Sequence, residues 1–382
     1  MSSTPFIVFV LAADSSVSYC SLPIRDAQIK FVNAILRTID REGEHLLGET
    51  SVLDNVNSQL AQELVKSYGE QVTERIVESA MSQSPIFITV NLSGKRTHDE
   101  RKTELERVRA MFSEASGAEA QLLEHGSIRV PDELPSVVSN WPGYSAGEWW
   151  VQDPSASLPA IAMEKILSSD NMTKLDELHV VDLCSAPGGK TAQLCSFGFG
   201  HVTAVELSHK RTMALSENLG RLGMKERCEI VVADGREWKP ESDDRVDAVL
   251  LDAPCSATGV GSRRPDVLRK SPDLQDITAL QRELAIHAID DLLKDGGILI
   301  YATCSLLHSE SEDQIRWLLS RVDGPGVENI PFTEGEIPGF DSAIDKNGWL
   351  RVIPGQLKGP PSQCDGFFVA RLRRKNANHN VP

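Results

Sequence analysis

The sequence predicts an α/β protein whose main domain is a doubly wound, mainly parallel sheet. From residue 178 onward, short apolar runs alternate with segments of helical periodicity, as in consecutive strand–helix–strand units. A glycine-rich turn follows the first apolar run, and acidic residues follow the next three, where an open sheet of this kind binds its ligands. The expected strands are 179–183, 202–206, 229–232, 246–251, 298–302 and 367–372.

The chain before this sheet divides into two parts that differ in their expected secondary structure. Residues 22–82 are expected to be helical around a polar loop at 40–57, because apolar residues recur there at helical spacing. Short strands are expected at 86–90 and 128–130, with a charged helix at 97–112 between them. We therefore expect a helical region at 1–83, a small α+β module at 84–140, the main domain at 141–375 and a tail at 376–382.

Helix-capping residues predict where helices of the main domain begin and end. One helix carries its leucines on a single face and is expected to end at Gly223. Ser271 as N-cap and Pro272 as first residue predict a helix that runs to 295–296. Ser309 and Glu312 have the spacing of a capping box for a further helix.

Composition narrows the class of protein. The 382 residues are 41% hydrophobic and carry a net charge of −16, which argues against broad non-specific nucleic-acid binding but allows a local basic groove. No apolar run reaches membrane-spanning length, so no membrane partner is expected. The seven cysteines form no CxxC pair, which favours reduced thiols over disulfides or a metal site. We expect a cytoplasmic protein, or an organellar one if the source is eukaryotic.

The strongest local motif is the turn at 182–191, which follows a strand and opens a helix. It fails the P-loop pattern, since Cys184 stands where the first glycine belongs, and the dinucleotide pattern GxGxxG is absent. S-adenosylmethionine (SAM) is the remaining common ligand of such a crevice. Its ribose would need a carboxylate at the end of the second strand, where Glu206 stands, and Asp234 and Asp252 end the next two strands. Each acid taken singly is more simply a solvated strand-end residue.

Two cysteines also follow apolar strands. Cys255 stands in Asp-Ala-Pro-Cys and Cys304 in Ala-Thr-Cys-Ser, and thiols at strand ends suggest covalent chemistry on an electrophilic carbon. The alternative is a pair of buried structural cysteines, because free cysteine packs as a small hydrophobe.

Taken together, the motifs at 184–190, 252–259, 302–305 and 365–368 resemble those of the Nop/Sun family of RNA cytosine-C5 methyltransferases. The likeness is greatest to the bacterial Sun/Fmu type, which acts on small-subunit ribosomal RNA. Residues 31–37 look like the end of that type's NusB-like helical domain, which we expect to be shortened here, and 141–156 resembles its lead-in to the catalytic domain. The likeness is strong over about 140–372 and weaker before. It implies a Rossmann-like methyltransferase sheet.

The resemblance assigns roles to individual residues. Cys304 would attack cytosine C6, Cys255 would assist product release, Asp252 would stabilise the charge on N3, and Lys190 would lower the pKa of the attacking thiol. In DNA cytosine methyltransferases the cysteine after proline attacks, so Cys255 taken alone would suggest the opposite roles. The SAM-binding residues would be Cys184, Ser185, Ala186, Pro187, Gly188, Gly189, Lys190, Glu206, Asp234 and Asp252. Ser185, Glu206 and Ala257 stand where the family usually has Ala, Asp and Gly.

The implied partner is RNA, most simply rRNA, with no metal. Basic residues that could contact it are Lys95, Arg96, Arg101, Arg263, Arg264, Arg269 and Lys270, and Trp149 and Trp150 could stack on bases or pack in a core. Two other functions stay open: the same chemistry on tRNA or another RNA, and a non-catalytic RNA-binding assembly factor.

Overall fold

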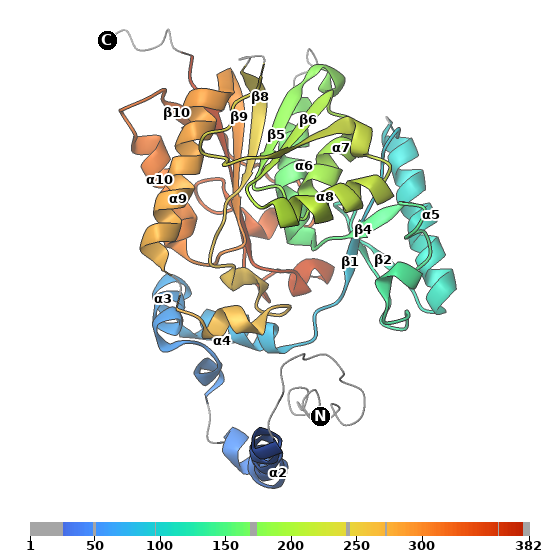
Figure 1. Cartoon of the computed structure of the whole chain (residues 1–382), viewed down its shortest axis with the longest axis vertical. Helices are drawn as coiled ribbons and strands as arrows, with labels where there is room; N and C mark the ends of the chain where they lie inside the picture. The colour runs from blue at the N-terminus through green and yellow to red at the C-terminus, as the bar shows by residue number, and fades with distance from the viewer. Residues whose placement is uncertain are drawn as a thin grey trace.

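The main domain is built on an eight-stranded sheet (Figure 1). The computed structural model describes residues 26–48, 51–95, 97–168, 174–241, 245–271, 273–357 and 359–376. The sheet order is β10-β12-β9-β8-β5-β6-β7, with β11 paired to β12. These strands span β5 His179–Leu183, β6 His201–Glu206, β7 Cys228–Val232, β8 Val246–Asp252, β9 Leu293–Thr303, β10 Val327–Asn329, β11 Leu350–Val352 and β12 Phe367–Arg374.

The five strands from β7 to β9 run parallel, and β12 joins β9 antiparallel. The expected doubly wound, mainly parallel α/β fold is therefore confirmed. Because parallel strands need crossover connections, their carboxyl ends gather along one edge of the sheet.

Alternating strand residues face two separate cores, which explains the near-continuous apolar runs. Val180, Leu250 and Ile300 pack under α6 (Pro154–Ser168), α7 (Gly189–Phe197) and α8 (His209–Arg221). Their neighbours Val181 and Leu251 face the other way, where α9 (Leu274–His287) and α10 (Glu312–Ser320) cover the sheet. Figure 1 shows the first set in green and the second in orange, on either side of the strands.

A second, four-stranded antiparallel sheet has the order β2-β3-β1-β4. Its strands are β1 Phe87–Val90, β2 Gln121–Leu122, β3 Ile128–Arg129 and β4 Trp149–Val151, and α5 (His98–Ser116) packs on it. The expected module boundary after residue 140 thus cuts through this sheet, because β4 pairs with β1. Trp149 is fully buried against Phe112, and Trp150 is 5% exposed, so both tryptophans have core positions.

The helical region consists of α2 (Asp26–Gly48), α3 (Ser58–Tyr68) and α4 (Glu70–Met81), with a short turn at Val52–Asn55. Leu60, Leu64 and Ile76 of α3 and α4 form one core with Leu268 and Leu306 of the main domain. Figure 1 shows these two helices, in blue, directly beneath loops of the main domain.

Three boundary predictions were wrong. The expected loop at 40–57 is helical through Gly48. The helix predicted from Ser271 begins at Leu274, because the Asp273 carboxylate caps it, and it gives way to a π-helical turn at Ala288–Leu292 before β9. The predicted capping box at Ser309 does not form, because Glu312 is held by Arg351 and Ser311 is the N-cap of α10. Pro272 lies outside the described residues.

Candidate active site

The turn after β5 is shaped to bring backbone close to a ligand. Cys184 has a left-handed backbone with φ of 61°, and Gly188, the N-cap of α7, has φ of 101°. A Cβ on Gly188 would stand 3.2 Å from the Leu215 side chain, so both conformation and space require glycine there. The first turn of α7 presents backbone N–H groups toward this loop, as in an anion-binding helix start.

Glu206 ends β6 and is 3% exposed. Its carboxylate accepts hydrogen bonds from the backbone N–H of Ala186 at 3.3 Å and of Ser208 at 3.0 Å, and pairs with Arg211 at 3.1 Å. The side chain therefore ties the turn after β5 to the turn after β6. Glu206 stands at the end of its strand, as the sequence predicted.

A cavity of 590 Å³ opens at these strand ends. Cys184, Glu206 and Asp234 all line it, with Pro254 at the start of the next motif. Asp234 is paired with Arg236 at 2.6 Å, which also contacts Glu283. Of the predicted SAM-binding residues, Cys184, Glu206 and Asp234 line this cavity, whereas the residues 185–190 and Asp252 do not. Its carboxylates and apolar side chains fit the ribose and adenine parts of an adenosyl ligand.

Lys190 and Asp252 form an ion pair, with Nζ 2.7 Å from Oδ2. Burial opposes the charge of Lys190, but the carboxylates of Asp252 and Asp182 outweigh it and raise the pKa of Lys190. The same ammonium also interacts with Cys304 and lies 5.2 Å from the centroid of the Phe367 ring. A permanent cation is thus held beside a thiol and a carboxylate.

The two predicted thiols meet. Sγ of Cys255 lies 3.4 Å from Sγ of Cys304, because β8 and β9 are adjacent parallel strands whose ends reach the same edge. The hydrogen bond to Cys304 and burial raise the pKa of Cys255 well above its ordinary value. Cys255 therefore holds its proton more firmly than an ordinary thiol, and the Lys190 ammonium interacts electrostatically with Cys304.

Several contacts that the sequence did not reveal hold these loops together. Gly259 donates its N–H to Cys304 O at 2.8 Å and accepts from the N–H of Gly366 at 2.8 Å. A Cβ on Gly259 would stand 2.3 Å from Gly366 O, so the motif at 252–259 and the one at 365–368 touch backbone to backbone. Glu310, in the short helix His308–Glu310, bonds to both cysteine loops. Glu310 can be recognised as part of this site only in the folded structure, where Ser256 and Ser305 lie next to each other.

The other cysteines differ from this pair. Burial raises the pKa of Cys184 to about 12. Cys195, Cys228 and Cys364 are buried, and all six described cysteines are free of disulfides. Cys20 lies outside the described residues.

The described basic residues proposed for RNA already have partners within the protein. Arg263 pairs with the buried carboxylates of Asp153 and Asp365. The remaining contacts are Lys95 with Glu104, Arg101 with Glu164, Arg264 and Lys270 with Asp266, and Arg269 with the carbonyl of Asp54. Arg96 lies outside the described residues.

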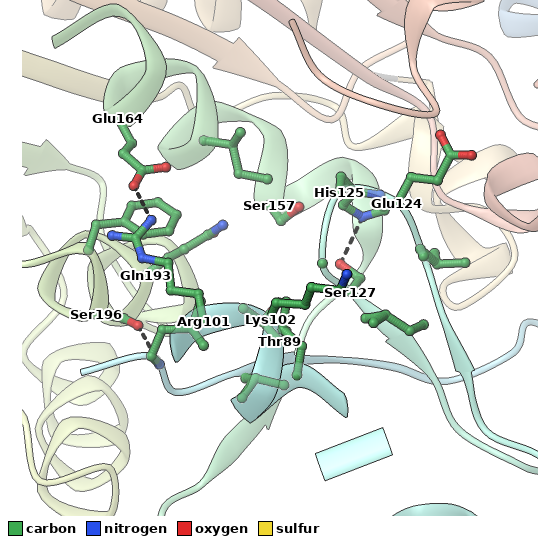
Figure 2. A pocket seen from close by; sticks show the side chains of 18 of the residues that line it. Thr89, Arg101, Lys102, Glu124, His125, Ser127, Ser157, Glu164, Gln193 and Ser196 are labelled. Atoms are coloured by element: carbon green, nitrogen blue, oxygen red, sulfur yellow. Dashed lines mark hydrogen bonds and ion pairs between the residues drawn. The ribbon is translucent and has the colours of Figure 1, made fainter. Parts of the chain in front are cut away.

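A second cavity, of 460 Å³, lies between the small module and helices α6 and α7. Figure 2 shows the Arg101–Glu164 pair, and the contact of His125 with Ser127, among its lining side chains. Within the described chain it contains none of the predicted SAM-binding or catalytic residues.

The part of the chain that the structure describes contains no group of three or more His, Cys, Asp or Glu placed to hold a metal ion. Within the same residues, none of the helices combines the length and apolar composition that a membrane crossing needs.

Known proteins resemble this chain over most of its length. A model of the family described as 16S rRNA methyltransferase RsmB/F matches residues 171–373. Ribosomal RNA small subunit methyltransferase B of Escherichia fergusonii is 35% identical over 366 residues, which cover 93% of this chain and 76% of that protein.

Two solved structures share the fold. The protein PH0851 matches with a TM-score of 0.66 and 26% identity, over 94% of this chain and 70% of that one. NSun6 from Pyrococcus horikoshii, solved with the SAM analogue sinefungin, matches with a TM-score of 0.63 and 19% identity, over 84% of this chain and 98% of its own.

Proposed function

Because this chain belongs to the 16S rRNA methyltransferase RsmB/F family, we propose that it methylates carbon 5 of a cytosine in small-subunit rRNA through a covalent cysteine adduct. The family resemblance predicted from the sequence is confirmed, and with it SAM-dependent methylation of rRNA. The observation that carries the finer proposal is the pair of thiols 3.4 Å apart beside the Lys190–Asp252 ion pair.

The chemistry requires a thiolate because cytosine C5 is a poor nucleophile. Addition of the Cys304 sulfur to C6 gives C5 enamine character, and C5 can then accept the methyl group that bound SAM supplies. The Lys190 ammonium would stabilise negative charge on the attacking sulfur during the reaction, while Cys255, whose pKa is raised, keeps its proton. The target base must leave its stack to reach these groups.

Asp252 and Lys190 would act together on the base. The carboxylate can accept a hydrogen bond from the exocyclic amino group, and the proton held between Asp252 and Lys190 can balance the charge that develops at N3. After methyl transfer, water accepts the C5 proton, the electrons of the C5–H bond re-form the C5–C6 double bond, and the Cys304–C6 bond breaks to release the sulfur as a thiolate. Cys255, whose Sγ lies 3.4 Å from that of Cys304, would assist by donating its proton to the departing sulfur.

The cavity at the ends of β5, β6 and β7 would hold SAM. Glu206 would bind the ribose hydroxyls, and Asp234 an adenine or ribose edge, while the 184–190 turn would bind the amino-acid end. A protein that methylates small-subunit rRNA would work where that rRNA is assembled, which in bacteria is the cytoplasm.

The adduct tests the roles of the cysteines. The protein is incubated with SAM and 16S rRNA, and RNA-linked protein is separated under denaturing conditions for wild type, Cys304→Ala and Cys255→Ala. We expect Cys255→Ala to accumulate the adduct and Cys304→Ala to form none. Cys195→Ala, at a buried cysteine of α7, is the matched control and should turn over without accumulation.

The reverse pattern between the two variants would exchange the roles of the cysteines. Methylation of tRNA in preference to rRNA would show that tRNA is the substrate. No methylation of either RNA by wild type would favour the non-catalytic assembly factor.

A further inference from the structure

Glu310 lies between the two loops that carry the thiols. Its carboxylate is fully buried and accepts four hydrogen bonds. Oε1 accepts from the backbone N–H of Ser256 at 2.8 Å and from the amide of Gln281 at 3.2 Å. Oε2 accepts from the Ser256 hydroxyl and from the Ser305 hydroxyl at 2.5 Å.

The two serines are the residues that follow the cysteines. Ser256 comes directly after Cys255 and Ser305 directly after Cys304, and their hydroxyls are 3.1 Å apart. A single carboxylate therefore bonds to both loops one residue from each sulfur. Because all four partners are donors, the set matches an acceptor-only carboxylate.

Residues of β9 and α9 hold Glu310 in place. The Tyr301 hydroxyl, on β9, donates to the backbone carbonyl of Glu310 at 2.8 Å. Gln281, on α9, bonds the Pro254 carbonyl at 2.9 Å as well as the Glu310 carboxylate. The carboxylate is thus held in place by the sheet and by α9 rather than by the loops alone.

We propose that Glu310 is a positioning residue that joins the two cysteine loops at one carboxylate and so sets the distance between the thiols. Its electrostatic effect supports this role. After the Cys304 hydrogen bond and burial, the charge of Glu310 is a further cause that raises the pKa of Cys255. The role of Glu310 in catalysis rests on the proposed function, whereas its hydrogen bonds to the two cysteine loops are those of the protein without RNA.

The first test follows the thiols without RNA. Alkylation of Cys255 and Cys304 by iodoacetamide is measured by peptide mass spectrometry across pH, in wild type and Glu310→Gln. We expect Cys255 to react at lower pH in the variant, because a charge that holds its proton is gone. Glu336→Gln removes a carboxylate from a remote ion pair with Arg371 and should leave the profile unchanged.

The second test measures turnover. Glu310→Gln should lower kcat by roughly 10- to 100-fold while KM for SAM stays within about twofold, as for a residue that acts on the reacting groups rather than on cofactor binding. Ser256→Ala removes one link to the Cys255 loop while keeping the charge of Glu310, and it should increase the alkylation rate of Cys255 because the loop is held less firmly. Ser256→Ala is the variant to test if Glu310→Gln does not fold.

A wild-type alkylation profile in both Glu310→Gln and Ser256→Ala would overturn the proposal, as would an equal shift in Glu336→Gln. Because alkylation needs no RNA, a wild type that fails to methylate would count against the proposed function and leave this result standing.

Discussion

At the scale of single residues, Asp182 makes the stability depend on pH. Burial raises its pKa to about 7, although the Thr191 hydroxyl, 2.6 Å from Oδ2, acts in the opposite direction. The folded protein therefore keeps a proton that the unfolded chain releases near pH ~4. The stability contributed by this group falls as pH rises from about 4 to about 7, by up to about 1.4 kcal/mol per unit.

We expect Asp182→Asn to flatten this part of the pH dependence, because the amide imitates the protonated acid. The measurement is urea unfolding of both proteins between pH 5 and 8, with the difference in free energy compared at each pH. Parallel curves would mean that Asp182 does not bind the proton.

Gly188 is a second residue whose replacement has a defined effect. Gly188→Ala adds a Cβ at φ of 101°, 3.2 Å from Leu215, and should cost about 1–3 kcal/mol in stability and weaken SAM binding. Gly220→Ala, in α8, is the control, because a Cβ there would meet nothing within 4 Å. Thermal unfolding and calorimetric titration with SAM check both, and equal losses in the two variants would contradict the assignment.

At the scale of elements, α3 supports the loop that carries Cys304. The Tyr68 hydroxyl donates to the Leu306 carbonyl at 2.6 Å, and the Tyr68 ring meets His308 edge-on at 5.2 Å. Burial raises the pKa of Tyr68 to about 12, so this hydroxyl stays a donor at neutral pH. The helical region is thus connected to the active site through direct contact.

Tyr68→Phe should lower the free energy of unfolding by about 1–2 kcal/mol through the lost hydrogen bond. It should also slow adduct formation, because Leu306 is two residues from Cys304. Tyr144→Phe, before β4, is the control for removing a hydroxyl. Urea unfolding and the rate of adduct formation are the measurements. An unchanged rate of adduct formation would mean that the contact of α3 with the Cys304 loop does not affect the reaction.

At the scale of the whole molecule, RNA must bind to a chain with net charge −16. Asp266 pairs with Lys270 at 2.6 Å and with Arg264 at 3.4 Å on an exposed loop next to the Asp252 motif. Asp266→Asn would leave both cations available to phosphates. It should tighten RNA binding by about two- to fivefold at low salt, with the gain lost at high salt.

Filter binding across a salt series measures this effect, with Glu328→Gln on β10, which frees Arg373 of β12, as control. Equal gains in both variants would indicate a general charge effect, and no gain in either would place the RNA elsewhere.

The sequence predicted the parts of this molecule that depend on local pattern. Strand ends gave the positions of Glu206, Asp252 and Cys304, because apolar runs mark buried parallel strands. It did not predict Glu310 or Tyr68, since their partners lie 54 and 238 residues away. It also treated Arg263 as free to bind RNA, because an ion pair with Asp153 is visible only after folding.

The place of β12 in the sheet has a consequence for synthesis. This strand, Phe367–Arg374, lies between β9 and β10 and also pairs with β11, so an inner position of the sheet is filled by the strand that comes last in the order of the sheet's strands along the chain. Until it leaves the exit tunnel, β9 exposes an unpaired edge beside Cys304. The sheet therefore cannot be completed until this strand has emerged from the ribosome, and the nascent chain is a candidate client for chaperones that shield strand edges.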